Sequence, residues 1–199
     1  YLPSHFPLAE ALVPFREQLG KRPPFATAEL FWSPYAGEAL MVSGFVHPPT
    51  EDMARTAFAL RGTDQLITVK GLEGSPDLPR DRTCIVGLSR PGLEPDFERL
   101  LLHPRDYGFA APEVPLLPPV ELATAMWAVL QGQPSSLTEL AIWNGGFYLW
   151  QCGHCPELAA GIAEAQALFA SGRVAAKLQE IQAAVQSIGQ TPILESALS

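Results

Sequence analysis

The sequence has few cysteines, few basic residues and no long apolar run. Three cysteines in 199 residues do not make a disulfide framework, so we expect a protein of the reducing cytoplasm. The formal net charge of −8, with only 13 lysines and arginines, disfavours general nucleic-acid binding. No apolar run approaches the roughly 20 residues of a membrane-spanning helix. We therefore expect no membrane partner, and nucleic acid is a disfavoured one.

The composition is that of a folded protein. Apolar residues make up 47% of the chain and charged residues 17%, and 199 residues are enough for one hydrophobic core. We expect a single α/β domain over 1–188, followed by a flexible tail over 189–199, where apolar periodicity is lost. The chain opens at Tyr1 rather than at a methionine, which leads us to expect a longer natural polypeptide.

The clearest local pattern lies between residues 39 and 70. Two apolar segments, 39–46 and 65–69, have the length and composition of buried strands. Between them, Thr50-Glu51-Asp52 supplies an N-cap and an acidic first turn for a helix over 52–60. A strand, a short helix and a strand predict a parallel βαβ unit. Ligands of such sheets lie beyond the carboxyl ends of the strands, here near His47 and 70–73.

The rest of the chain predicts more strands and then helices. Segments 83–88 and 97–102 are typical of a strand pair around a turn at 90–92. Upstream, apolar spacing over 8–19 predicts a helix that Pro14 kinks or splits and that ends at Gly20. Downstream, helices are predicted near 120–131, 136–151, 157–170 and 173–187. The predicted fold class is α/β: a mostly parallel sheet with helices on both faces and a helical C-terminal end.

Several short phrases follow one another in the same order as in a known family. They are Leu2-Pro3 through Phe6-Pro7, Phe15-Arg16-Glu17-Gln18-Leu19-Gly20-Lys21-Arg22 with Phe25, Pro34, Gly44-Phe45, His103-Pro104-Arg105-Asp106-Tyr107-Gly108-Phe109, Leu130 with Gly132, Ile142-Trp143-Asn144, and Gly161 through Ala165 to Ser171-Gly172. Their order over residues 1–180 resembles the C-terminal α/β domain of the anthranilate phosphoribosyltransferase family. The phrase Lys70-Gly71-Leu72-Glu73-Gly74-Ser75 is similar to a divergent branch of that family, some of whose members bind nucleic acid.

The resemblance implies a glycosyltransferase activity of the phosphoribosyl type, as in tryptophan biosynthesis. Members of the family transfer ribosyl phosphate from phosphoribosyl pyrophosphate to a small aromatic acceptor amine, with Mg²⁺ on the pyrophosphate. They are commonly homodimers with a small helical domain and a larger α/β domain. The implied cofactor is therefore Mg²⁺, and the implied partners are the donor, the acceptor and a second subunit.

Two departures from the family pattern concern the donor. The family's glycine-rich pyrophosphate loop lies upstream of anything that matches Tyr1, and no glycine-rich loop elsewhere in these residues replaces it. Where the family has an adjacent Asp-Glu pair for metal, this chain has Glu73-Gly74. The resemblance makes Glu73 the candidate metal ligand, and one carboxylate binds Mg²⁺ weakly. We expect the isolated chain to be inactive as a transferase, and we assign no catalytic residue.

Arg22 is the candidate substrate-binding residue, because it aligns with the arginine that holds the acceptor carboxylate in the family. The planar guanidinium binds a carboxylate through two hydrogen bonds. The following residues 23–26 depart from the threonine and asparagine of the enzymes, which predicts an acceptor other than anthranilate. The alternative for Arg22 is a surface arginine after a helix cap, and the alternative for Glu73 is a solvated loop carboxylate.

Other functions stay open at this point. A non-catalytic binding module, with nucleic acid or a protein as partner, is the main alternative. The motif Cys152-Gly153-His154-Cys155 also occurs in thiol–disulfide oxidoreductases, and Thr191-Pro192 follows it. The flanking segments are predicted to be helices, which favours a loop pair that oxidises on storage. Zinc is disfavoured, because only three ligands lie near one another.

Three further side chains have a chemical and a structural interpretation. His103, at a strand end before Pro104, is an acid/base candidate, and a histidine that caps a turn is the commoner case. Asn144 in an apolar helix is predicted to hydrogen-bond the backbone. The aromatic residues Trp127, Trp143, Phe147 and Trp150 are predicted to be a packed helical face.

Overall fold

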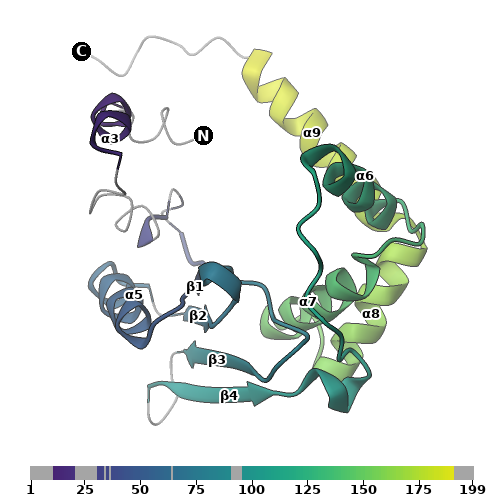
Figure 1. The fold of residues 1–199 in the computed structure, drawn as a ribbon, viewed down its shortest axis with the longest axis horizontal. Helices are drawn as coiled ribbons and strands as arrows, with labels where there is room; N and C mark the ends of the chain where they lie inside the picture. Colours follow the sequence, from purple (N-terminus) through teal and green to yellow (C-terminus); the bar gives the residue numbers. More distant parts are fainter. Residues whose placement is uncertain are drawn as a thin grey trace. The chain divides into compact units, whose positions relative to one another are not determined.

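The computed structural model describes residues 11–20, 31–33, 35, 37–63, 65–90 and 96–190, with the side chains of 188–190 excepted. By its contacts the chain divides into two compact units, Tyr1–His103 and Pro104–Ser199 (Figure 1). Each unit is described by itself. The single domain over 1–188 and the tail over 189–199 stay predictions.

The first unit contains a four-stranded sheet in the order β1-β2-β3-β4, formed by β1 (Leu40–Gly44), β2 (Gln65–Val69), β3 (Cys84–Ser89) and β4 (Glu98–Leu102). Strands β1 and β2 pair in parallel and are joined by α5 (Pro48–Leu60), so the predicted βαβ unit is confirmed. The pairs β2–β3 and β3–β4 are antiparallel. The α/β class is confirmed.

The prediction of a mostly parallel sheet is wrong for the described strands, because one of their three pairings is parallel. The physical reason lies in the connections. A parallel neighbour needs a crossover, usually a helix. Between β2 and β3 the chain forms only a one-turn 3₁₀ helix, η2 (Leu72–Gly74), and then returns beside β2. The sheet is therefore mixed.

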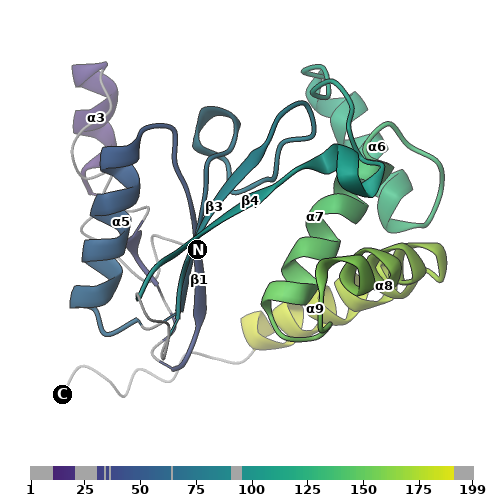
Figure 2. The same cartoon turned by 90° about the horizontal axis from the view of Figure 1, so that it is seen from below.

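Helix α5 begins earlier than the sequence pattern predicts, and it packs against one side of the sheet (Figure 2). Pro48 and Pro49 occupy its first positions, where the missing N–H groups would be unpaired in any case. Ala54 and Phe58, both 1% exposed, pack with Leu66 in one apolar cluster. Burying a phenylalanine of this kind contributes about 1.5–3 kcal/mol, so this contact fixes α5 on the strands.

Near the N-terminus, α3 (Val13–Leu19) confirms a helix that ends at Gly20, whose φ of 60° closes it in the left-handed conformation. Pro14 lies in the first turn of the described helix, so the predicted kink is absent there. The residues of the predicted helix before 11 lie outside the described ones. None of the described helices has the length and apolarity needed to cross a membrane.

The second unit confirms the predicted helical C-terminal end. It contains η3 (Pro104–Tyr107), α6 (Pro119–Leu130), α7 (Thr138–Gln151), α8 (Leu158–Ala170) and α9 (Arg173–Gln190). Helices α7 and α8 approach closely, because a Cβ added at Gly161 would lie 2.2 Å from the carbonyl oxygen of Gly146. Trp143 of α7 is fully buried, with the rings of Tyr107 and Phe109 at 5.7 and 5.6 Å. These contacts make the core of the unit.

Candidate functional site

The carboxyl ends of β1 and β2 form the candidate site, which we call the strand-end ledge and define as Gly44–His47 and Lys70–Ser75. Gly44 is in register with Val69, and the amide of Phe45 donates to the carbonyl of Val69 at 2.9 Å. A Cβ added at Gly44 would lie 1.9 Å from the carbonyl oxygen of Gly74. Only glycine fits there, so the end of β1 holds the loop after β2 in place.

The loop after β2 presents Glu73 to solvent. Glu73 has φ 51° and ψ 22°, and it is the one non-glycine residue with a positive φ among those that the structure describes. The left-handed conformation costs a non-glycine residue about 1–2 kcal/mol, and such strain is concentrated at functional loops. Ser75 supports the loop: its hydroxyl donates to Asp77 Oδ2 at 2.9 Å and accepts from the Asp77 amide at 3.0 Å.

The start of α5 borders the ledge but offers few backbone donors. His47 is the N-cap and is exposed, and its carbonyl accepts from the amide of Thr50 at 2.9 Å. Pro48 and Pro49, which follow it, have no N–H. A helix N-terminus that cradles phosphate needs these donors. The ledge therefore offers ionisable side chains, namely His47, Lys70 and Glu73, rather than a backbone anion cradle.

A row of residues that runs from buried Ser43 to partly exposed Arg99 crosses the sheet next to the ledge. The pairing register places Ser43, Thr68, Gly87 and Arg99 side by side on successive strands. Arg99 donates two hydrogen bonds to the carboxylate of Glu51 on α5, at 2.8 and 2.7 Å. The hydroxyl of Thr68 donates to the same carboxylate, which is 4% exposed. These bonds tie the first turn of α5 to β2 and β4.

Gly87 leaves the space that this row needs. A Cβ added there would lie 2.4 Å from the hydroxyl oxygen of Thr68 and 2.6 Å from the ring of Phe97. The guanidinium groups of Arg55 and Arg99 lie over the Phe97 ring, with their central carbons 3.9 and 4.9 Å from the ring centroid. The sequence pattern did not predict this network, because it assigned Glu51 only to the N-cap and acidic first turn of the helix. An acidic residue on the apolar side of the helix was the available signal.

The structure describes one of the two predicted site residues. Glu73 lies on the ledge, whereas Arg22 lies outside the described residues. Within the described ranges, no group of three or more His, Cys, Asp or Glu side chains could hold a metal ion. One carboxylate, such as that of Glu73, is compatible with an Mg²⁺ ion whose other ligands are substrate phosphates and water. It does not form a metal cage of the protein's own.

Two other predicted residues have structural partners. His103 Nδ1 lies 3.0 Å from the hydroxyl oxygen of Thr83, next to the paired ends of β3 and β4, which favours the structural interpretation. The amide of Asn144 donates to the carbonyl of Leu140 at 3.0 Å, as predicted. Neither residue lies on the ledge.

The CxxC motif lies at the wrong end of a helix for an oxidoreductase site. Cys152 is the C-cap of α7, and α8 begins only at Leu158. In a thioredoxin-type site, the first cysteine lies at a helix N-terminus, where the helix dipole favours the thiolate. None of the three cysteines, Cys84 and Cys155 included, takes part in a disulfide bond.

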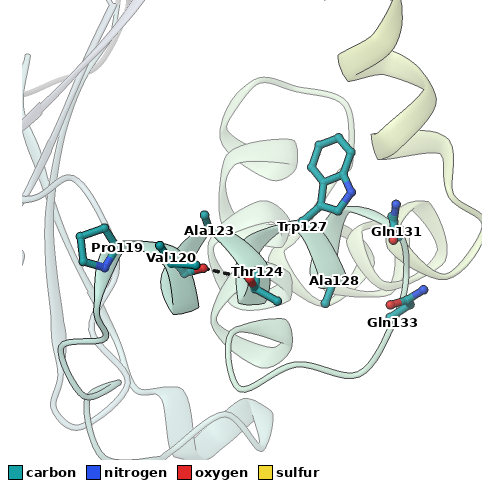
Figure 3. Close-up of a pocket in the computed structure, with 8 residues that line it drawn as sticks. All are labelled: Pro119, Val120, Ala123, Thr124, Trp127, Ala128, Gln131 and Gln133. Carbon is teal, nitrogen blue, oxygen red and sulfur yellow. Dashed lines mark hydrogen bonds between the residues drawn. The ribbon is translucent and has the colours of Figure 1, made fainter.

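Helix α6 has an apolar hollow of about 670 Å³ on one side (Figure 3). It is lined by Pro119, Val120, Ala123, Thr124, Trp127, Ala128, Gln131 and Gln133. The hydroxyl of Thr124 donates a hydrogen bond to the carbonyl of Val120 at 2.9 Å. Trp127 is 46% exposed, so the predicted packed aromatic face is wrong for this residue, because it lies on a different helix from the buried Trp143 and Phe147.

Comparisons with known proteins confirm the family resemblance. No protein-family model matches the chain. Anthranilate phosphoribosyltransferases from Polynucleobacter asymbioticus and Paracidovorax citrulli are 29% and 27% identical to it over 190 and 191 residues. In both cases the match covers 94% of this chain and 54% of the relative. The chain therefore spans about half the length of the curated relatives that it matches.

Solved structures agree in fold. The enzyme from Thermus thermophilus matches with a TM-score of 0.67 and 22% identity, over 87% of this chain and 51% of the other. The Saccharomyces cerevisiae enzyme in complex with 4-fluoroanthranilate matches with a TM-score of 0.73 and 19% identity, over 88% and 51%. A variant of the yeast enzyme with Mg bound gives 0.72 and 20% over the same shares.

Proposed function

We propose that this chain is the α/β part of a phosphoribosyltransferase-like protein related to the anthranilate phosphoribosyltransferases, and that its strand-end ledge faces the sugar-phosphate donor. The observation that carries the proposal is the contact of Gly44 with Gly74, which joins the ends of two parallel strands into one surface. In open α/β sheets, ligands bind beyond these ends. The likeness to the relatives runs over 94% of the chain and supports the same role.

Each candidate residue has a role in this proposal. Glu73 contacts the Mg²⁺ that the donor pyrophosphate carries, because hard cations prefer carboxylate together with phosphate oxygens. Arg22 anchors the carboxylate or phosphate group of a small aromatic acceptor. The solvent exposure of Glu73 leaves its carboxylate available for such a contact.

The proposal includes that the isolated 199-residue chain does not catalyse transfer. Departure of pyrophosphate needs donors and cations aimed at the developing charge. Pro48 and Pro49 remove backbone donors from the nearest helix start, and the ledge offers one carboxylate for metal. The assay is formation of phosphoribosyl anthranilate from the donor, Mg²⁺ and anthranilate, with the Polynucleobacter asymbioticus enzyme as positive control. Turnover by the purified chain would contradict the proposal.

Donor binding tests the ledge independently of turnover. Calorimetric titration with phosphoribosyl pyrophosphate is expected to show weak binding, near a dissociation constant of about 1 mM, that requires Mg²⁺. Glu73→Gln should weaken the Mg²⁺-dependent part. Glu38→Gln is the matched control, since Glu38 is also exposed but precedes the opposite end of β1. Equal losses in both variants would count against the role of Glu73.

A binding module without catalysis is the second candidate, and the α6 hollow is the observation that favours it. The hollow has no charged lining residue, and the chain carries a net charge of −8, so the favoured partner is a protein rather than nucleic acid. A gel shift at low ionic strength is expected to be absent. A second copy of the chain is the partner that the family likeness favours, and sedimentation over a dilution series tests it.

The cytoplasmic location is part of the same proposal. Cys84, Cys152 and Cys155 take part in no disulfide bond, which suits a reducing compartment. Localisation of a tagged protein by fractionation checks this assignment, and recovery from an oxidising compartment would contradict it.

A further inference from the structure

The two cysteines of the CxxC motif lie in one tight turn at the end of α7. Gly153 between them has φ 75°, which reverses the chain as a helix-ending glycine does. The amides of His154 and Cys155 both donate to the carbonyl of Leu149, at 2.9 and 3.2 Å. The backbone therefore folds over the last turn of α7, and Cys152 and Cys155 belong to the same short closed loop.

The two thiols differ in access to solvent. Cys152 is exposed, whereas Cys155 is buried, with 9% of its surface exposed. Reagents in solution can therefore reach Cys152 first. The third thiol, Cys84, is fully buried and donates to the carbonyl of Pro79 at 3.1 Å. It provides a control within the same chain.

We propose that Cys152 and Cys155 form a redox modification site, at which a small-molecule disulfide such as oxidised glutathione reversibly oxidises the pair. The thiolate of Cys152 attacks one sulfur of the reagent, forms a mixed disulfide and releases the first reduced thiol. The thiolate of Cys155 then attacks the Cys152 sulfur and releases the second. The protein loses two electrons and two protons, and one molecule of disulfide reagent becomes two molecules of thiol.

The position of the pair suits a switch rather than a catalyst. Cys152 lies at the C-terminal end of α7, where the helix dipole does not favour an anion. The bond would tie the end of α7 to the segment that leads into α8 at Leu158, which is buried. The two helices already pack closely through Gly146 and Gly161. Oxidation therefore cross-links the short loop that connects two helices already packed against each other.

Mass spectrometry of the intact chain in glutathione redox buffers tests the proposal. The wild type is expected to lose about 2 Da as the buffer becomes more oxidising, and to regain it on reduction. Peptide mapping should place the bond between Cys152 and Cys155, with Cys84 still a thiol. This readout needs no variant, so it does not depend on the folding of one.

Three cysteine variants test which thiol makes the first attack on the reagent and which makes the second. Cys155→Ser should retain one glutathione on Cys152, a gain of about 305 Da, because the second attack cannot occur. Cys152→Ser should show neither product, and Cys84→Ser should behave as the wild type. Circular dichroism checks that each variant is folded. Wild-type protein that gains only glutathione, or that forms only disulfide-linked dimers, would overturn the proposal, since the turn would then keep the two sulfurs apart.

Discussion

The ion pair between the buried carboxylate of Glu51 and the partly exposed guanidinium of Arg99 gives the sharpest stability prediction. Arg99→Met keeps most of the apolar stem but leaves the Glu51 carboxylate with Thr68 as its only remaining donor in the row that crosses the sheet. Removing one partner of a buried ion pair costs about 3–5 kcal/mol. The Arg99 side chain is 38% exposed, so water replaces part of the lost interaction. Discounted for that exposure, the expected loss is about 2–3 kcal/mol.

Hydrogen exchange under native conditions, compared between the wild type and Arg99→Met, measures this loss of stability amide by amide. The amides of β2 and α5 should lose protection by the amount expected, because Glu51 and Thr68 lie on these elements. Arg105→Met is the control: the Arg105 side chain is 76% exposed, and it forms a surface ion pair with Asp106 at 3.6 Å. Its effect should stay within about 0.5 kcal/mol.

A double variant distinguishes the loss of the ion pair from the cost of leaving the Glu51 carboxylate buried without it. Glu51→Met with Arg99→Met removes both charges, so no carboxylate stays buried without a partner. The double variant should be less destabilised than Arg99→Met alone, with about 1 kcal/mol remaining for the unpaired Thr68 hydroxyl. The reasoning is refuted if Arg99→Met changes β2 protection no more than the Arg105 control, or if the double variant is the less stable of the two.

Three further changes have outcomes set by the geometry. Gly87→Ala should cost about 1–3 kcal/mol in urea unfolding, because its Cβ would meet the Thr68 hydroxyl at 2.4 Å; an unchanged midpoint would contradict this. Gly161→Ala should destabilise α7 and α8 by a similar amount, about 1–3 kcal/mol in hydrogen exchange, whereas Gly145→Ala, with its nearest atom at 3.4 Å, should be neutral or stabilising. Glu73→Gly should raise stability by up to about 1 kcal/mol, since glycine accepts the left-handed backbone; lower stability than Glu73→Ala would argue against strain there.

The local elements could be predicted from the sequence, and the pairing of distant ones could not. The apolar segments 39–46 and 65–69 have the composition of buried strands, and the short helix between them favours a parallel pair, as found for β1 and β2. The direction of β3 depends on whether the preceding segment crosses over the sheet, and no local pattern encodes this. The bond from Glu51 to Arg99 spans 48 positions, so periodicity carries no information about it.

The candidate site shows the same division. The ledge could be located from the sequence, because it follows from the order of strand, helix and strand. The family resemblance drew attention to Glu73, but its left-handed backbone could not be foreseen, since glutamate rarely adopts that conformation. The role of Gly44 also became visible only in the structure, where the facing carbonyl of Gly74 excludes any side chain.

Chemical-shift mapping with phosphoribosyl pyrophosphate and Mg²⁺ on the ¹⁵N-labelled chain tests the central claim most directly. If the ends of β1 and β2 form the surface that faces the donor, the shifted amides should be those of Gly44–Val46 and of Lys70–Ser75, together with His47. Perturbations confined to other segments, such as the α6 hollow around Trp127, or no perturbation at millimolar donor, would contradict it.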